Sequence, residues 1–215
     1  MENTGVMGSY LKARYSVFKW RAELAIAQKI VLALCMAGLT GILAQTRVYL
    51  PWTPIPITGQ TFAVLMAGVL LGKNWGGISQ AIYVVLGVAG IPWFAGASGG
   101  YGALIGPSGG YLIGFIFAAL FVGHFTDKYV KARNFWSLLL IMSFANFALI
   151  YIPGLLQLGI WFRLTKGTFP TLWQLLLMGA TPFIAGGIIK VFAAATLAQS
   201  ITPKKAFNNE IDAQR

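Results

Sequence analysis

The sequence contains few of the residues that hold metals or carry out acid–base chemistry. Its 215 residues include one cysteine, Cys35, one histidine, His124, and five acidic residues. A single cysteine excludes an internal disulfide framework and any multi-cysteine metal site. Only 10% of the residues are charged, whereas a soluble domain carries about a quarter. These shortages argue against a soluble metalloenzyme.

Carboxylates are missing from every long apolar run. The five acids lie in the tails or beside one basic flank: Glu2, Glu23, Asp127, Glu210 and Asp212. Carriers driven by protons place carboxylates or histidines within their spans, so an ion-coupled carrier is disfavoured. An intramembrane hydrolase would have to use His124, or Asp127 together with Asp212, and neither arrangement makes a catalytic site. We expect no enzyme, no catalytic residue, no metal and no cofactor.

Long hydrophobic runs dominate what is present. Hydrophobic residues make up 57% of the chain, and the mean hydropathy is +0.72. A helix that crosses a membrane needs about 20 mostly apolar residues. Six runs approach this length, at 29–48, 57–71, 76–94, 111–126, 135–161 and 172–200. The sequence predicts an all-α membrane protein with six transmembrane helices within residues 28–200, an N-terminal segment 1–27 and a tail 201–215.

The basic residues are distributed unevenly around these runs. Of the 16 lysines and arginines, twelve fall before or at the start of the first run, after the last, or in the second-to-third and fourth-to-fifth loops. Three lie in the other loops, Arg47, Arg163 and Lys166, and Lys190 lies inside the last run. Because short cytoplasmic loops are rich in lysine and arginine, both termini are predicted to be cytoplasmic. The net charge of +11 is therefore read as a topology signal and not as a nucleic-acid footprint.

Two of the three predicted outer loops, 46–55, 95–110 and 163–171, have unusual compositions. Prolines 51, 54 and 56 prevent a continuous helix there and predict a stiff, extended segment. Residues 95–114 carry eight glycines and the string Ser-Gly-Gly-Tyr twice. A phosphate-binding loop would need Gly-Lys-Ser/Thr, but Gly72-Lys73 is followed by asparagine. The glycine-rich segment is either a flexible loop tip or a backbone lid over a ligand, and the adjoining Trp93 and Phe94 favour the lid.

Lys190 and a row of small residues each have two interpretations. A mid-span lysine costs about 2.5–3.5 kcal/mol on insertion scales, so Lys190 either snorkels to an interface or faces the bundle interior and donates to a ligand oxygen. Ala33, Ala37 and Gly41 recur every four residues, which lets helices approach closely. They either pack internally or form a docking face for a second membrane protein.

Three motifs resemble those of the BioY family, in the same order. They are Pro-Trp-Thr-Pro-Ile-Pro-Ile-Thr-Gly-Gln-Thr-Phe at 51–62, Gly-Ile-Pro-Trp-Phe-Ala-Gly at 90–96 and Gly-Pro-Ser-Gly-Gly-Tyr-Leu-Ile-Gly-Phe at 106–115. That family comprises the biotin-specific S components of energy-coupling-factor (ECF) vitamin transporters, and the similarity covers roughly residues 28–199. The resemblance implies an S-component-like bundle of six helices in the cell membrane, outer loops that close over biotin, and an Ala-x-x-x-Ala face, matched by Ala33 and Ala37, for a coupling subunit.

One position departs from the family pattern. The last helix in the family resembles Pro-Gly-Asp-Leu-x-Lys, with Asp and Lys in the biotin site, whereas this chain has Ala-Gly-Gly-Ile-Ile-Lys at 185–190. Lys190 is kept, and Gly187 stands at the aspartate position. Losing the acid removes a charge-assisted hydrogen bond worth about 1.5–3 kcal/mol. Another group then accepts from the ligand, the affinity is lower, or the ligand differs.

The resulting hypothesis is a membrane subunit that captures biotin from outside and is driven by ATPases in trans through a transmembrane coupling subunit. The expected ligand-binding residues are Lys190, Ser98, Gly99, Gly100, Trp93, Phe94, Tyr151, Gln60 and Thr58, the last two orienting the ligand or bracing the first outer loop. The expected docking residues are Ala33, Ala37 and Gly41. The alternatives are the same fold with a biotin-like vitamin as ligand, or a solitary facilitator without ATPase partners.

Overall fold

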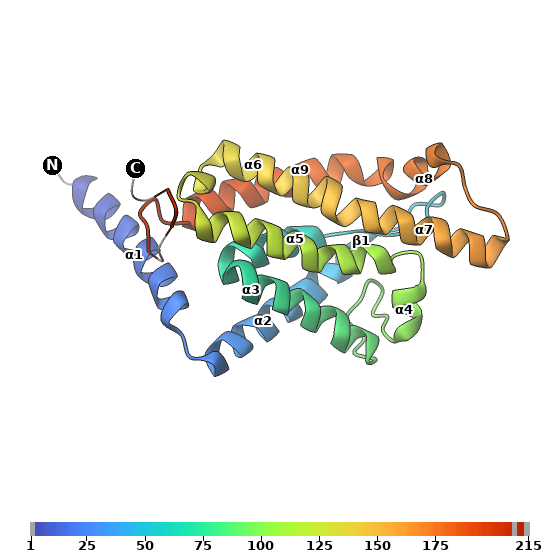
Figure 1. Ribbon diagram of the computed structural model, residues 1–215, viewed down its shortest axis with the longest axis horizontal. Coiled ribbons are helices and arrows are strands. Elements are labelled where there is room, and N and C mark those ends of the chain that lie inside the picture. The colour runs from blue at the N-terminus through green and yellow to red at the C-terminus, as the bar shows by residue number, and fades with distance from the viewer. Residues whose placement is uncertain (1–2, 208–209, 213–215) are drawn as a thin grey trace.

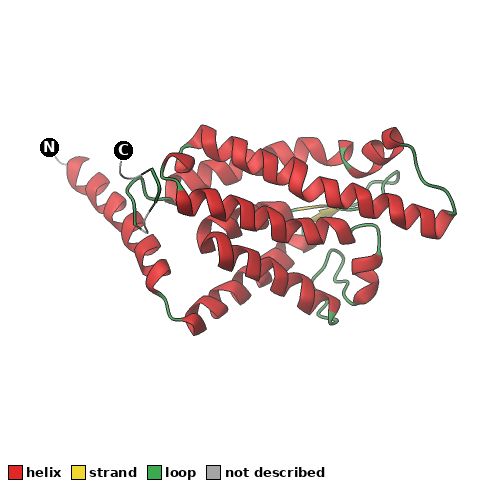
Figure 2. Cartoon of the chain, in the orientation of Figure 1, coloured by secondary structure: helices red, strands yellow, loops and turns green. Residues whose placement is uncertain are grey.

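The chain forms a mostly helical bundle (Figures 1 and 2). The computed structural model describes residues 3–207 and 210–212. The elements are α1 (Asn3–Glu23), α2 (Ile26–Gln45), β1 (Arg47–Val48), β2 (Ile57–Thr58), α3 (Gln60–Val88), α4 (Tyr101–Ile105), α5 (Gly109–Lys128), η1 (Lys131–Arg133), α6 (Phe135–Phe144), η2 (Ala145–Ile150), α7 (Tyr151–Lys166), α8 (Leu172–Gly179) and α9 (Thr181–Ile201).

Several helical segments are long and apolar enough to cross a membrane. In the part of the chain that the structure describes there are five: Ile26–Gln45, Gln60–Val88, Gly109–Lys128, Phe135–Lys166 and Thr181–Ile201. The expectation of a helical, multi-pass membrane protein is therefore confirmed. Within the predicted N-terminal segment, residues 3–23 form helix α1, and the expected run 172–200 is divided at Ala180.

Helix α3 is not straight, because the chain reverses at Gly72. In a straight helix Gln60 and Tyr83 would be about 34 Å apart along the axis, yet the Gln60 amide donates to the Tyr83 hydroxyl at 2.7 Å. Gly72 has φ 78° and ψ −176°, a conformation that is open essentially to glycine alone. The segment is therefore a helical hairpin with its turn at Gly72.

Replacing Gly72 by alanine should destabilise the fold by roughly 2–4 kcal/mol, from backbone strain and a steric clash. A Cβ atom there would lie 2.3 Å from Asp127 Oδ2, and Asp127 holds Arg21 and the Lys73 amide at 2.7 and 2.8 Å. Thermal unfolding in detergent would measure the loss. Gly38→Ala is the matched control, because nothing lies within 4 Å of its Cβ position. Equal melting temperatures for the two variants would contradict the assigned turn.

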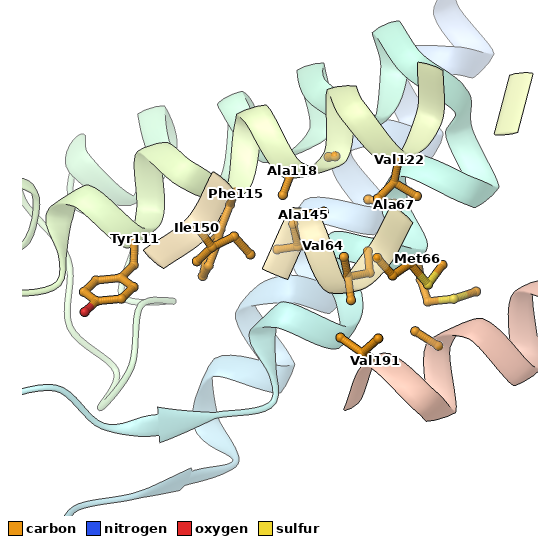
Figure 3. Packing of buried hydrophobic residues seen from close by; sticks show 14 of the residues in the cluster. Val64, Met66, Ala67, Tyr111, Phe115, Ala118, Val122, Ala145, Ile150 and Val191 are labelled. Carbon is orange, nitrogen blue, oxygen red and sulfur yellow. The ribbon is translucent and has the colours of Figure 1, made fainter. Parts of the chain in front are cut away.

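Helix α5 occupies the centre of the bundle, between the α2–α3 side and the side formed by α6, α7 and α9 (Figure 1). Side chains from α3, α5, η2 and α9 meet in the core, among them Val64, Phe115, Ile150 and Val191, which are at most 3% exposed (Figure 3). Packing of these helices fixes the positions of the loops at one end of the bundle, where the site described below lies.

The small-residue face of α2 is buried inside the protein. Ala33 and Ala37 are 0% exposed, and a Cβ atom added to Gly41 would lie 3.0 Å from Trp93 Cβ. Internal packing, one of the two interpretations, accounts for all three residues. Their role as a docking face for a second membrane protein stays a prediction, and it would require neighbouring residues of this chain to move and uncover these atoms.

The two termini lie at the same end of the bundle (Figure 1), where α1 packs on the C-terminal segment. Arg14 donates to the carbonyls of Gln199, at 2.7 Å, and Thr202. The ring centroids of Phe18 and Phe207 are 5.6 Å apart.

The C-terminal segment also carries a carboxylate whose pKa is shifted. Burial raises the pKa of Asp212, but hydrogen bonds from the Lys131 and Val130 amides outweigh it and lower the pKa below its usual value. The stabilisation from this carboxylate is therefore present above the ordinary aspartate pKa and is lost as the pH falls through the lowered one.

Candidate ligand-binding site

A cavity of about 230 Å³ lies at the opposite end from the termini, between the β1–β2 hairpin, the glycine-rich loop and helices α3, α5, α7 and α9. Ligand pockets for drug-sized molecules are typically about 300–1,000 Å³, so this one suits a small molecule. Its lining is mainly apolar and aromatic, with a few polar groups: Tyr49, Pro54, Ile55, Pro56, Thr58, Gln60, Thr61, Phe94, Ala95, Ser98, Ala103, Ser108, Tyr111, Leu112, Phe115, Ile150, Tyr151, Phe183 and Lys190.

The proline-rich loop forms one wall of this cavity. Strands β1 and β2 pair antiparallel, with Arg47 opposite Thr58, and so close the loop at its base. Ile55 between the prolines is 6% exposed, and its amide donates to Thr53 Oγ1 at 3.2 Å. The prolines restrict the backbone, and the hairpin fixes where the loop begins and ends.

The glycine-rich loop is held in place by hydrogen bonds. Phe94 and Ser98 form a β-bridge, with the Phe94 amide donating to the Ser98 carbonyl at 3.0 Å. Gln45 donates to the Phe94 carbonyl at 3.1 Å and accepts from the Ala97 amide at 3.0 Å. The Phe94 ring fills the space beside Gly87, where a Cβ atom would be 2.1 Å from Phe94 Cζ. This ordered backbone favours the lid interpretation over a flexible tip.

A chain of polar contacts links the two loops. Thr58 donates to Gln60 Oε1 at 2.8 Å, Gln60 donates to the Tyr83 hydroxyl at 2.7 Å, and that hydroxyl donates to the Trp93 carbonyl at 3.2 Å. The Trp93 indole in turn donates to the Tyr83 carbonyl at 2.9 Å. Gln60 and Thr58 therefore brace the first loop while also lining the cavity.

Lys190 reaches into the cavity from α9. Its ammonium donates to the Thr58 carbonyl at 2.9 Å, and an ammonium has three donors, so it can donate further bonds to a ligand. The acids within the described residues have other partners: Glu23 with Lys19, Asp127 with Arg21, Glu210 with Arg133, and Asp212 with backbone amides. Lys190 thus lines the cavity and bonds to the first loop, as the interpretation of an inward-facing lysine predicts.

Six of the nine predicted ligand-binding residues line the cavity: Thr58, Gln60, Phe94, Ser98, Tyr151 and Lys190. Trp93, Gly99 and Gly100 lie outside the lining. Trp93 packs on Tyr83, with ring centroids 5.3 Å apart. The Gly100 amide donates to the Gly87 carbonyl at 2.7 Å, so in this conformation it is not available to a ligand. These residues shape the loop.

Several lining residues were not anticipated from the sequence. Tyr111, in the second Ser-Gly-Gly-Tyr string, donates to the Gly179 carbonyl at 2.7 Å and so connects α5 to α8. The buried Thr61 hydroxyl has no hydrogen-bond partner among the residues that the structure describes.

Within residues 3–207 and 210–212, no three His, Cys, Asp or Glu side chains are grouped so as to hold a metal ion.

A mostly apolar cavity with one cationic side chain, enclosed by loops at one end of a membrane helix bundle, defines a membrane-embedded small-molecule-binding protein. The BioY family model matches residues 12–207. The chain belongs to the BioY family, which is a family of transporters and not of enzymes. The family resemblance read from the three motifs is therefore confirmed.

The relatives and a solved structure agree with this assignment. The probable biotin transporter BioY of Methanothermobacter thermautotrophicus is 55% identical over 150 residues, which cover 70% of this chain and 96% of the relative. The biotin transporter BioY of Thermotoga maritima is 34% identical, covering 69% and 82%. A crystal structure of the S component for biotin from an ECF-type ABC transporter matches with a TM-score of 0.71 at 26% identity, covering 82% of this chain and 93% of that one.

Proposed function

We propose that this protein is the substrate-binding membrane subunit of a biotin uptake system. The observation that carries the proposal is the cavity itself, in a chain of the BioY family: three BioY-like motifs supply its walls, and Lys190 supplies its cationic group. Relatives named as biotin transporters and the likeness to a biotin S component support biotin as the ligand.

The lining suits the chemistry of biotin. Biotin combines an aliphatic chain and a thioether ring with two polar ends, a carboxylate and a cyclic urea. Phe94, Tyr111, Tyr151 and Phe183 would contact the apolar parts. Lys190 would donate to a ligand oxygen, and Ser98 would contribute a hydroxyl. Thr58 and Gln60 would position Lys190 and the first loop.

Six crossings with both termini in the cytoplasm are part of the proposal. The hairpin at Gly72 divides α3 into two antiparallel arms, so α2, the two arms, α5, the α6–η2–α7 segment and α8–α9 would give six crossings. An even number returns the chain to its starting side, which agrees with the packing of α1 against the C-terminal segment. The excess of lysine and arginine on that side supports the cytoplasm of a cell membrane.

The energy source would lie in other subunits. The sequence has no phosphate-binding motif, so we propose that a transmembrane coupling subunit and ATPases of an ECF module act in trans. In cells that lack their own biotin uptake system, uptake of labelled biotin should then require expression of both the ECF module and this chain. Uptake by this chain alone would instead support a solitary facilitator.

The direct test is binding. The purified protein in detergent should bind biotin with a 1:1 stoichiometry in isothermal titration calorimetry, and mass spectrometry should find biotin among co-purifying small molecules. No heat of binding with biotin, together with another bound vitamin in the mass spectrum, would overturn biotin as the substrate while leaving the transporter class in place.

A further inference from the structure

The Asn146 side chain is buried in the bundle without a hydrogen-bond partner. Asn146 is 0% exposed, and neither its Nδ2 nor its Oδ1 atom makes a hydrogen bond to the residues that the structure describes. The buried amides of Gln60 and Gln80, by contrast, bond to Tyr83 and to Thr40 and Ser79. An unpaired buried amide costs free energy, and such an exception calls for an explanation.

Asn146 lies just behind the cavity wall, and η2 places it there. This segment is a π-helix, in which the i to i+5 hydrogen-bond pattern brings residues five apart close to the same face. Asn146 therefore shares a face with Tyr151, which lines the cavity together with Ile150. The Tyr151 hydroxyl is near enough to interact with the Asn146 amide but does not meet hydrogen-bond geometry.

Gly187 on α9 leaves room for this amide. A Cβ atom at Gly187 would lie 3.1 Å from Asn146 Nδ2 and 2.9 Å from Phe147 Cε1. Any side chain there would push on both residues. Lys190 is one helical turn further along the same face of α9 and reaches the cavity. The unpaired amide thus lies against α9 at Gly187, one turn away from the lysine that reaches the cavity.

The two groups are chemically complementary to one kind of ligand. An ammonium only donates, whereas a carboxamide offers an acceptor oxygen beside donor hydrogens. A cyclic urea presents N–H donors on either side of an acceptor carbonyl. The described acids all lie elsewhere with other partners, so a neutral group has to accept from the ligand N–H.

We propose that Asn146 recognises the cyclic urea of the ligand, its Oδ1 accepting a ring N–H and its Nδ2 donating to the ring carbonyl. The inference rests on the proposed function, since it takes biotin as the ligand. Binding requires the Tyr151 side chain to turn aside, a rotamer change of the kind common at binding sites. Asn146 is then a specificity residue that is left unpaired in the ligand-free protein.

The test compares Asn146→Leu with wild type in two measurements. Calorimetry with biotin should show roughly 10- to 100-fold weaker binding, the loss expected for two buried hydrogen bonds. Thermal unfolding of the ligand-free protein should show equal or higher stability, because leucine removes an unpaired polar group of similar size. The matched control is Gln80→Leu, whose amide is bonded to Thr40 and Ser79 and lies outside the cavity lining. It should lose stability and keep wild-type affinity for biotin.

The second variant, Asn146→Asp, tests recognition even if the leucine variant does not fold. A carboxylate should favour 2-iminobiotin, whose protonated guanidine ring replaces the urea, and raise its affinity relative to biotin by about tenfold or more. Unchanged biotin affinity in Asn146→Leu, or an unchanged ligand ratio in Asn146→Asp, would overturn the inference alone. A wild-type protein that binds no biotin would overturn it together with the proposed function.

Discussion

Replacing Lys190 by methionine is expected to weaken biotin binding by about 10- to 100-fold while leaving the protein folded. Charge-assisted hydrogen bonds contribute about 1.5–3 kcal/mol, which corresponds to that range. Lys190 is the one cationic side chain that lines the cavity within the described residues. Methionine keeps most of the aliphatic length, so the packing on α9 should be preserved.

The empty protein should tolerate this change well. A lysine within a membrane span is costly, and the bond that Lys190 donates to the Thr58 carbonyl at 2.9 Å offsets only part of that cost. We therefore expect the melting temperature of Lys190→Met without ligand to equal or exceed that of wild type. Calorimetry with biotin and thermal unfolding measure the two effects separately.

Lys166→Met is the control for Lys190→Met, because Lys166 is an exposed residue at the end of α7 and outside the cavity lining. It should bind biotin as wild type does. Wild-type affinity in Lys190→Met would refute the role of the ammonium. A collapse of ligand-free stability in that variant would show that Lys190 is mainly structural.

Replacing Arg133 by methionine should have the largest effect on stability, a loss of about 3–5 kcal/mol. Arg133 and Glu210 form an ion pair at 2.6 Å, and their side chains are 1% and 0% exposed. Arg133 also donates to the carbonyls of Thr126, Pro203 and Lys205. The variant would leave the Glu210 carboxylate buried without its cation, and that is the costly outcome.

A double variant separates the pair from the packing around it. Because isosteric apolar replacement of a whole buried pair is often neutral, Arg133→Met with Glu210→Met should recover part of the lost stability. Lys19→Met is the control, since Lys19 and Glu23 are more than half exposed at 3.9 Å, and such pairs contribute at most about 1 kcal/mol. Biotin affinity should be unchanged throughout, because the pair lies at the far end from the cavity. A double variant no more stable than Arg133→Met would contradict this account.

The sequence predicted the chemistry of the site better than its geometry. Lys190 stood out because a charge inside an apolar run is costly, and the loops stood out because proline and glycine restrict or free the backbone. Those signals are local, and six of the nine residues chosen from them line one cavity. Asn146 gave only a weak signal, since a single asparagine in a span is far less costly than a charge.

Contacts between distant residues were not predictable in the same way. The spacing of Ala33, Ala37 and Gly41 shows that another helix can approach this one closely, but it does not show which helix. In the structure, the neighbours of these residues belong to the same chain. The turn at Gly72 falls between the predicted runs 57–71 and 76–94, so a break in the helix was expected there, but its backbone conformation was not. Its φ of 78° is a property of the packed chain.

By itself, the sequence determined that this is an apolar, helical membrane protein with basic flanks and a BioY-like set of loop motifs. Hydropathy, charge position and motif order depend on residue identity alone, so they can be read without coordinates. Only the tertiary structure decided that Lys190 meets the Thr58 carbonyl, 132 residues away in the chain, and that Gly187 faces an unpaired Asn146. Both follow from the packing of α9 against elements distant in sequence, and close packing depends on the shapes of all the neighbours at once.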